Sequence, residues 1–514
     1  MAGVVCSWRH LDQSLCSWST SMPQSLPLPP ELVTQALADF EIPGLAVAVV
    51  KDDAVVFARG YGVRQRGDSA PVDEHTLFAV GSISKSFTAT SLAMLVDARQ
   101  LGWDDRVIDQ LPGFQMADPY VTRELTVRDL LVHRSGLADV SGGTLWYGSS
   151  YDRREVVRRL RWLQPVSSFR SHYAYQNVTY LVAGQIIEAV TGHSWDTFVH
   201  DRIFGPLGMT TSTTSITALA HAANVATPHA RVHGTVQPIA YRNYDNVGPA
   251  ASINSNVIEL AQYVRLFLGG GVYGGQQLFS PAQARELWTA QMVVPIQTPP
   301  PPLAALAPQW MAYGLGWFVR DYHGHKLVTH AGGVDGMTAL VTMLPDVQLG
   351  VVVLTNAEEA LMAAITYQLL DTYLGRPQIS WLPAYLQLRA ERIAKGEAAE
   401  TQRNAARVPG TSPALDLAGY AGTYVDQLYG TATVTLEDAR LVLRFDATPA
   451  FTGDLQHWHY NTFQITWRDP VVPKGLVTFP LNADGQVAEL QFAQPKLLDV
   501  DFSELHFKRP SKPA

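Results

Sequence analysis

Ser82 and Lys85 lie three residues apart, at the start of a segment with helical character that runs to Gln100. Residues at positions i and i+3 of a helix share one face, so the lysine amine can reach the serine hydroxyl and act on its proton. The unpaired N–H groups at a helix N-terminus, including that of Ser82, could stabilise an oxyanion. A capping serine beside a solvated lysine has the same spacing, so the pair predicts nucleophilic catalysis only if further partners accompany it.

A nucleophilic serine also needs a group that handles the proton of the leaving group, and a Tyr-x-Asn triplet could supply a phenol for this task. The sequence holds three such triplets, namely Tyr175-Gln176-Asn177, Tyr241-Arg242-Asn243 and Tyr244-Asp245-Asn246. The first directly precedes a helix-like segment, whereas the other two lie in a loop-like stretch. From residue types alone, each triplet could equally be a surface turn.

A third candidate element follows the strand-like residues 326–329 and consists of His330, Ala331, Gly332 and Gly333. The histidine could donate a hydrogen bond to a substrate, and the glycines would let a substrate approach the backbone closely. These residues are therefore candidates for the far side of a site built around Ser82.

The order and context of these segments resemble the serine β-lactamase and penicillin-binding-protein superfamily, in its branch of class C β-lactamases, esterases and D-aminopeptidases. The resemblance covers residues 32–375 and selects Tyr175 over the two rival triplets. It implies an α/β domain, with an antiparallel sheet flanked by helices, and an all-helical lobe across the active-site cleft. Besides Ser82 and Lys85, it rests on the segments Leu125 to Leu137, Tyr175 to Gly184, Pro206 to Met209, Tyr313 to Trp317 and His330 to Gly332.

The resemblance also implies roles for single residues. Ser82 would form a covalent acyl-enzyme, Lys85 would hold or accept the proton, and Tyr175 would relay it. Asn177 would hydrogen-bond the substrate amide. Whether the lysine or the tyrosine is the base is disputed even among related enzymes.

The third element departs from the pattern of efficient β-lactamases, which usually carry Lys-Thr-Gly where this chain has His330-Ala-Gly332. The histidine resembles the esterases and peptidases of the group, and efficient β-lactam hydrolysis is not expected. Gly332 and Gly333 would line the substrate site, with the N–H groups of Ser82 and Gly333 as the oxyanion hole. We expect His330 to gain charge as the pH falls toward about 6.5 and then to favour anionic substrates.

The chain divides into four predicted regions. These are an N-terminal extension that we expect to be disordered, residues 1–31; the hydrolase domain, residues 32–375; a helical linker, residues 376–414; and an all-β domain, residues 415–510. The last region contains short β-rich runs about ten residues apart, which predict a closed barrel or sandwich. With its Tyr420-Ala-Gly-Thr-Tyr424 segment it resembles the lipocalin-like domain of some peptidases of this branch. The linker predicts two independent cores, so a chain that ends near Arg407 should still fold.

Composition excludes several other classes of protein. The 514 residues carry a net charge of −8, so nucleic-acid binding is not expected. There is no run of about 18 apolar residues and no export signal, which predicts no membrane span and a cytoplasmic location. Cys6 and Cys16 are the two cysteines of the whole sequence. No metal and no cofactor are expected, because the His323/His325 and His457/His459 pairs lack accompanying carboxylates.

The leading functional hypothesis is a peptidase, amidase or esterase that acts on a small-molecule or peptide substrate. A β-lactamase or a D,D-carboxypeptidase is the alternative within the same fold. A non-enzymatic ligand-binding sensor is the alternative from another class, and intact Ser82, Lys85 and Tyr175 count against it. Assembly into a homo-oligomer is left open.

Overall fold

The computed structural model describes residues 27–377 and 379–510. Cys6, Cys16 and most of the predicted N-terminal extension lie outside the described residues. The stretch on which the cytoplasmic location depends also lies there, so that location stays a prediction. Helix α1, Pro30–Phe40, begins at the end of the predicted extension.

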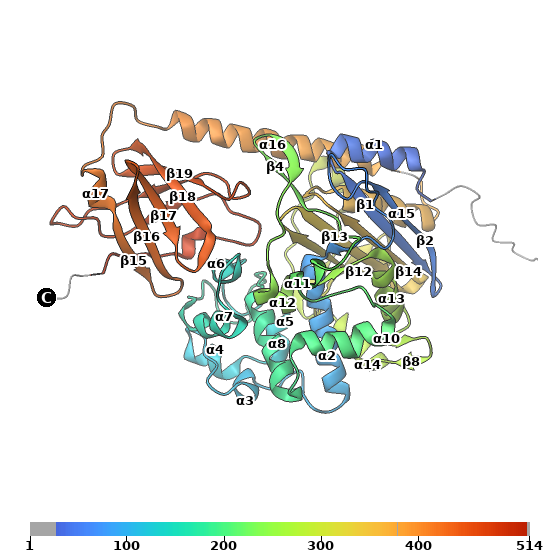
Figure 1. Ribbon diagram of the computed structural model, residues 1–514. Coiled ribbons are helices and arrows are strands. Elements are labelled where there is room, and N and C mark those ends of the chain that lie inside the picture. The colour runs from blue at the N-terminus through green and yellow to red at the C-terminus, as the bar shows by residue number, and fades with distance from the viewer. Residues whose placement is uncertain (1–26, 378, 511–514) are drawn as a thin grey trace, which may run out of the picture.

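An antiparallel sheet of eight strands forms the centre of the larger unit, in the order β2-β1-β14-β13-β12-β11-β10-β9. The beginning and the end of this unit meet in the sheet, because β1 pairs with β2 on one side and with β14 on the other (Figure 1). The strands are β1 (Gly44–Lys51), β2 (Ala54–Gly62), β9 (Met292–Val293), β10 (Met311–Tyr313), β11 (Phe318–Tyr322), β12 (His325–Val334), β13 (Met337–Leu344) and β14 (Leu349–Thr355).

The two faces of the sheet pack against different helices. Along β1, the odd-numbered residues 45–49 belong to one apolar cluster and the even-numbered residues 46–50 to another, because side chains alternate along a strand. Helices α1, α15 (Leu361–Tyr373) and the start of α16 (Trp381–Ala405) cover the first face. Helices α2 (Ser84–Asp97) and α13 (Val257–Leu268) cover the second.

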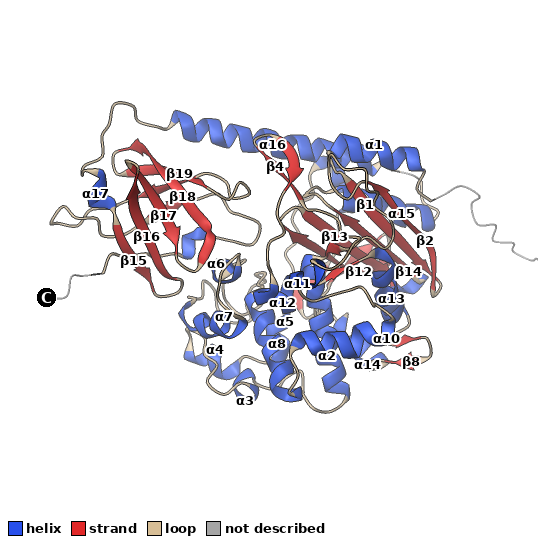
Figure 2. Cartoon of the chain, in the orientation of Figure 1, coloured by secondary structure: helices blue, strands red, loops and turns tan. Residues whose placement is uncertain are grey.

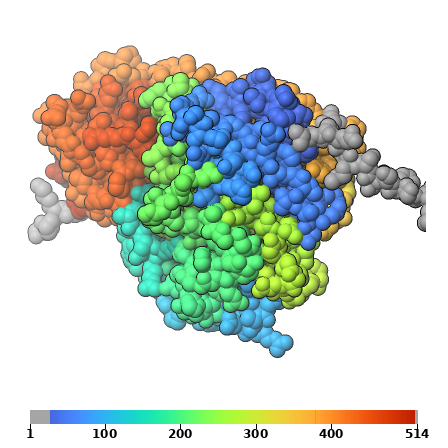
Figure 3. Space-filling model, turned by 45° about the vertical axis from the view of Figure 1, so that its right-hand side comes forward, coloured from blue at the N-terminus to red at the C-terminus, as the bar shows by residue number. Residues whose placement is uncertain are grey.

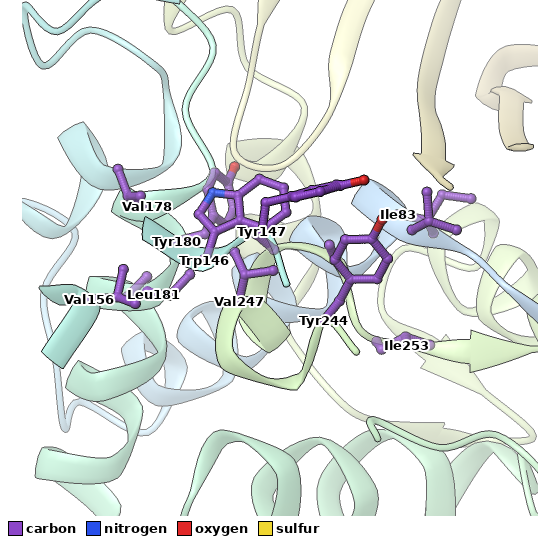
Figure 4. Close-up of a cluster of buried hydrophobic side chains, with 14 of the residues drawn as sticks. Ile83, Trp146, Tyr147, Val156, Val178, Tyr180, Leu181, Tyr244, Val247 and Ile253 are labelled. Carbon is purple, nitrogen blue, oxygen red and sulfur yellow. The ribbon is translucent and has the colours of Figure 1, made fainter. Parts of the chain in front are cut away.

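An all-helical lobe lies beyond α2 and is centred on α8, Val178–Thr191, which ends at Gly192 in the left-handed conformation. Figure 4 shows part of the lobe's core, where Val178, Tyr180 and Leu181 of α8 gather in one cluster with Trp146. The shorter helices are α3 (Val107–Gln110), α4 (Pro119–Glu124), α5 (Val127–Leu131), α6 (Gly143–Trp146), α7 (Arg153–Arg159), α9 (Trp195–Val199), α10 (Gly205–Leu207), α11 (Ile216–Leu219), α12 (Gly248–Ala251) and α14 (Pro281–Leu287).

The predicted β-lactamase-like α/β fold is therefore confirmed. Small two-stranded ribbons complete this unit: β3 (Phe78–Ala79) with β6 (Asn254–Ser255), β4 (His229–Val232) with β5 (Thr235–Pro238), and β7 (Val272–Tyr273) with β8 (Gln276–Gln277). Among residues 27–377 and 379–510, none of the helices is both long and apolar enough to cross a membrane.

The C-terminal unit is a curled antiparallel sheet of seven strands in sequential order, consistent with the predicted lipocalin-like domain (Figure 2). Lys508 forms β-bridges with Val425, near the first edge of this sheet, and with Glu489, near its last edge. These bridges close part of the gap between the two edges. A short helix, α17 (Leu417–Tyr420), precedes the sheet. The strands are β15 (Gly422–Asp426), β16 (Gly430–Glu437), β17 (Arg440–Phe445), β18 (Thr448–His459), β19 (Thr462–Trp467), β20 (Gly475–Thr478) and β21 (Gln491–Ala493).

The two units pack directly on each other, as the orange C-terminal unit does against the cyan helical lobe in Figure 3. Tyr147 of the lobe stacks on Phe451 of β18, with ring centroids 5.7 Å apart. Arg242 donates hydrogen bonds to Asp335 in the larger unit and, at 2.7 Å, to Asp469 in the smaller. One apolar cluster runs through both units, so their cores are in contact, and independent folding of the larger unit stays a prediction.

Candidate active site

Ser82 lies in a one-turn 3-10 helix, η1 (Gly81–Ile83), that leads directly into α2. Gly81 has a φ of +51°, and a Cβ atom there would lie 2.8 Å from the backbone N of Gly333. Only glycine accepts both this left-handed conformation and this close approach. The turn therefore holds Ser82 at the start of α2 and against strand β12.

Lys85 is fully buried and its Nζ donates hydrogen bonds to Ser82 Oγ at 3.0 Å, Asn177 Oδ1 at 2.5 Å and the Ala250 carbonyl at 3.2 Å. Burial lowers the pKa of this amine to about 7, although the carboxylate of Asp499 raises it in part. A neutral amine could keep its two N–H groups on Asn177 and Ala250 while its lone pair faces Ser82 Oγ. The site can thus present a proton acceptor to the serine hydroxyl near neutral pH.

Tyr175 directly precedes α8 and covers the amine of Lys85, whose Nζ lies 4.7 Å from the centre of the phenol ring. Burial and, after it, the charge of Asp499 raise the pKa of Tyr175 well above its usual value, and a hydrogen bond with Ser82 offsets only part of this rise. The phenol is therefore protonated at neutral pH. It can donate a proton or a hydrogen bond, whereas Lys85 is the better acceptor.

Gly332 and Gly333 lie on β12 beside the serine turn. A Cβ atom on Gly332 would lie 1.9 Å from the Val80 carbonyl oxygen and 3.2 Å from the backbone N of Ser82. A Cβ atom on Gly333 would meet only the Leu498 side chain, at 3.6 Å. Gly332 is thus required by packing, whereas Gly333 lies at the more open position beside Ser82.

His330 is buried, and both of its ring nitrogens have partners. Nε2 lies 2.9 Å from the Tyr313 hydroxyl and Nδ1 lies 2.6 Å from the Ala331 carbonyl oxygen. Burial and the charge of Lys85 lower the pKa of His330 to about 3. The expectation that His330 becomes charged near pH 6.5 and attracts anionic substrates is therefore wrong, because burial disfavours the charged imidazole and the positive charge of Lys85 adds to this effect.

Asn177, whose implied role of binding a substrate amide stays a prediction, is hydrogen-bonded to two side chains of the site. Its Oδ1 accepts a hydrogen bond from Lys85, and its Nδ2 donates one to Asp499 Oδ2 at 2.8 Å. Asp499 comes from the C-terminal unit, and sequence reasoning missed it. The residue follows β21 in a stretch without a motif, so no signal in the sequence connects it with Ser82.

His133 was also missed as a single residue, although it lies inside the segment Leu125 to Leu137. Its Nδ1 accepts a hydrogen bond from the Gln176 backbone N–H at 3.0 Å, and its ring lies 4.4 Å from that of Tyr175. Burial, with the charge of Lys85, lowers its pKa well below the usual value. A neutral His133 therefore supports the segment that carries Tyr175 and Asn177.

The two rival Tyr-x-Asn triplets have structural partners instead. The Tyr241 hydroxyl donates to the Ala226 carbonyl at 2.5 Å, and the Tyr244 hydroxyl accepts from the Asp335 N–H at 3.1 Å. A cleft of about 1090 Å³ lies near them, between the helical lobe and the C-terminal unit, but Ser82 does not line it. Within the described part of the chain, no cluster of three or more histidine, cysteine or acidic residues could hold a metal ion.

The antiparallel sheet, the helical lobe and the buried serine–lysine pair between them define a β-lactamase-like protein. A model of the Beta-lactamase family matches residues 30–373, and the chain belongs to that family. A second model, described as a domain of unknown function (DUF3471), matches residues 406–509. The predicted resemblance to this superfamily is thus confirmed.

Several relatives carry names that describe hydrolases or penicillin-binding proteins. The unguisins hydrolase ungD of Aspergillus violaceofuscus (strain CBS 115571) is 30% identical over 437 residues, which cover 79% of this chain and 76% of the relative. Penicillin-binding protein 4 of Amycolatopsis lactamdurans is 31% identical over 323 residues, which cover 62% of this chain and 82% of the relative.

Solved structures share the fold at lower identity. The octameric penicillin-binding protein homologue from Pyrococcus abyssi has a TM-score of 0.60 and 20% identity, and the match covers 93% of this chain and 98% of that one. A D-stereospecific amidohydrolase from Streptomyces sp. has a TM-score of 0.53 and 21% identity, over 67% of this chain and 96% of that one. The first match extends through both units of this chain.

Proposed function

We propose that this protein is a serine hydrolase that forms an acyl-enzyme on Ser82 and cleaves amide or ester bonds of small peptide or acyl substrates. The observation that carries the proposal is the buried amine of Lys85, 3.0 Å from Ser82 Oγ, with a pKa of about 7. An amine with this pKa is neutral in a substantial fraction of molecules at neutral pH and can accept the hydroxyl proton.

The proposed reaction has two halves. Neutral Lys85 accepts the proton of Ser82 Oγ as that oxygen attacks the substrate carbonyl carbon, and the N–H groups of Ser82 and Gly333 stabilise the oxyanion. The proton then passes from Lys85, through the Tyr175 hydroxyl, to the leaving nitrogen or oxygen, and the acyl group remains on Ser82. In the second half, water attacks the acyl carbon and loses a proton to the same groups. The bond from the acyl carbon to Ser82 Oγ breaks, the serine oxygen regains the proton, and the acyl group leaves as a carboxylic acid.

The relatives support the substrate class. An unguisins hydrolase, a penicillin-binding protein 4 and a D-stereospecific amidohydrolase all match this chain. The names of the first and last describe hydrolases, and the last describes hydrolysis of an amide. We accordingly favour peptidase or amidase activity over esterase activity. The absence of a lysine at position 330 argues against efficient β-lactam hydrolysis.

A substrate panel tests the proposal. It contains p-nitrophenyl esters, p-nitroanilides of D- and L-amino acids, short peptides and nitrocefin, each measured with wild-type protein and with Ser82→Ala. Intact-mass spectrometry after rapid quenching should show one added acyl group on wild-type protein and none on the variant. Turnover that survives in Ser82→Ala would refute the nucleophile, and binding without turnover of any substrate would favour the ligand-binding sensor.

The panel also separates the hydrolase alternatives. Preferential turnover of nitrocefin would favour a β-lactamase, and release of a terminal D-amino acid from a peptide would favour a carboxypeptidase. Self-association remains part of the proposal because the similar Pyrococcus abyssi protein is described as octameric. Light scattering on the full chain measures it directly.

A further inference from the structure

A turn of the C-terminal unit, residues 494–500, reaches into the site around Ser82. Asn177 donates a hydrogen bond to Asp499 Oδ2 at 2.8 Å, and the Leu498 side chain lies against Gly333. A Cβ atom on Gly143 of the helical lobe would lie 1.9 Å from the Asp499 carbonyl oxygen. The turn is therefore seated closely on the lobe and does not merely lie near it.

Neighbouring contacts fix this turn in place. Glu504 accepts hydrogen bonds from the Ser141 hydroxyl and, at 2.8 Å, from the Gly142 N–H. Lys496 pairs with Asp501 at 2.8 Å, and the Val500 N–H donates to the Leu497 carbonyl at 2.8 Å. These contacts hold Asp499 at a defined position beside Asn177.

The side chain of Asn177 joins Asp499 to the reacting groups. Its carbonyl oxygen accepts from Lys85, and its amide nitrogen donates to Asp499, so a continuous chain of hydrogen bonds runs from Ser82 to the C-terminal unit. Such a chain fixes the orientation of the amide, since the reverse orientation would place its N–H groups against Lys85 and its oxygen against a carboxylate.

Few charged side chains lie near Lys85 or Asp499, the groups at the two ends of the Asn177 bridge. The side chains that face Lys85 include the rings of Tyr175 and Tyr180 and the imidazoles of His133 and His330. Both histidines are kept neutral by lowered pKa values. Burial raises the pKa of Asp499, and the charge of Asp139 in the helical lobe adds to this rise, whereas the charge of Lys85 and the hydrogen bond from Asn177 favour the carboxylate.

We propose that Asp499, supplied by the C-terminal unit, is a positioning residue that orients Asn177 and stabilises the protonated form of Lys85, so that the active site is complete only when the two units are docked. This inference rests on the proposed function, because it assigns Lys85 as the base. Burial alone would leave the amine largely uncharged, and Asp499 restores part of its basicity. The C-terminal unit thereby helps to set the pH range of the reaction.

The sign of the effect follows from the charge. A carboxylate near an amine favours its protonated form and raises its pKa. Replacing Asp499 by asparagine keeps the shape and an oxygen acceptor for Asn177 but removes the charge. Lys85 should then lose its proton at lower pH, and the rise of kcat/KM with pH should move in the same direction.

The experiment measures kcat/KM against pH with p-nitrophenyl acetate, a neutral ester, in the full chain. For Asp499→Asn we expect the midpoint of the rising limb to move by about half a pH unit or more toward lower pH. At pH values below the limb, kcat/KM relative to its plateau should then be about threefold higher than in the wild type. Asp499→Glu keeps the charge and should retain a limb near that of the wild type. Thermal unfolding of each variant establishes that it is folded, and Asp499→Ser replaces Asp499→Asn if the latter does not fold.

Glu504→Gln is the matched control, because glutamine keeps an oxygen acceptor for Ser141 or Gly142 and removes a carboxylate next to the same turn, while the charge of Asp499 remains. Its limb should stay at the wild-type position. The inference would be overturned if the rising limb stayed at its wild-type pH in the uncharged Asp499 variants. It would also be overturned if Glu504→Gln moved the limb by the same amount as Asp499→Asn. If wild-type protein shows no turnover that depends on Ser82, the proposed function fails instead, and the two failures are therefore distinguishable.

Discussion

Burial acts in opposite directions on the two groups that can exchange a proton with Ser82. It lowers the pKa of the Lys85 amine to about 7 and raises that of the Tyr175 phenol well above its usual value. Both shifts favour the neutral form of each side chain. In the proposed mechanism lysine is accordingly the acceptor and tyrosine the donor, and the pH dependence of the rate tests this assignment.

The first prediction at the residue scale concerns pH. The rate kcat/KM for a neutral ester should rise with pH through about 7 and then level, because only the uncharged amine of Lys85 accepts the serine proton. A profile measured with p-nitrophenyl acetate checks this expectation. A value of kcat/KM that stays constant between about pH 5.5 and 8.5 would contradict this prediction.

The second prediction concerns the reacting residues as a set. Ser82→Ala should reduce kcat by about three orders of magnitude or more, and Lys85→Ala and Tyr175→Phe should each cause severe losses. Their combination should cost far less than the product of the single losses, because the three groups act as one unit. Circular dichroism confirms that each variant is folded, and strictly multiplicative losses would argue against a shared network.

A third prediction follows from the two occupied nitrogens of His330. Since its pKa is about 3, the histidine stays neutral, and the ratio of kcat/KM for an anionic ester to that for a neutral ester should be constant between about pH 5.5 and 8. Parallel profiles for the two esters test this. A ratio that climbs as the pH falls toward 6.5 would restore a charged His330 as a reader of substrate charge.

At the scale of elements, the catalytic segments were predictable because their order along the chain is distinctive. The helix after Ser82 and the strands from the beginning and the end of the larger unit also follow from periodicity, whereas the edge strand β9 was not predicted. Strand β18 was missed, since its sequence contains Pro449, Gly453 and Asp454, which are poor strand formers. Residues 502–507 form one of the β-rich runs from which the C-terminal barrel was predicted. They begin instead with a 3-10 turn, Phe502–Glu504, and Phe502 and Phe507 belong to the apolar core.

The role of Asp499 could not be predicted, because it depends on how two separately recognised units pack. No local pattern encodes a contact across 322 residues of sequence, such as that between Asn177 and Asp499. Periodicity and motifs report on one element at a time. The sequence accordingly proposes Ser82, Lys85 and Tyr175 within the larger unit, which the structure brings together, but not the Asp499 carboxyl group that comes from across the interface.

A fourth prediction compares the two glycines of β12. Gly332→Ala should destabilise the protein by about 2 kcal/mol or more, because its Cβ atom would overlap the Val80 carbonyl oxygen. Gly333→Ala should change stability little, since its Cβ atom would only touch Leu498. Chemical denaturation measures both. Equal stabilities would mean that β12 and the serine turn are farther apart than described.

At the scale of the whole molecule, the interface between the units combines apolar and ionic contacts. The stacked rings of Tyr147 and Phe451 lie near Arg242, whose guanidinium lies 4.3 Å from the centre of the Tyr147 ring. Arg242 also joins carboxylates of both units. Separating the units would expose these rings to water and leave a buried ionic group without one of its partners, which is costly.

A fifth prediction is that a chain ending at Arg407 is less stable than the full chain, with a Tm lower by about 5 °C or more. The reason is the loss of the apolar interface around Tyr147 and of the Asp469 partner of Arg242. Differential scanning calorimetry of both chains measures the change. An unchanged Tm would restore the original expectation of two independently stable cores.

Helix α16 has a kinetic consequence that follows from its length and its covalent continuity. Its 25 residues span about 37 Å at the usual rise, and most of its second half is exposed. It therefore acts as a tether, and docking of the C-terminal unit is a unimolecular step. The same contacts between two separate chains would weaken on dilution. Within one chain, the supply of Asp499 to the active site is independent of dilution, so the specific activity of a monomer should not fall as the protein is diluted.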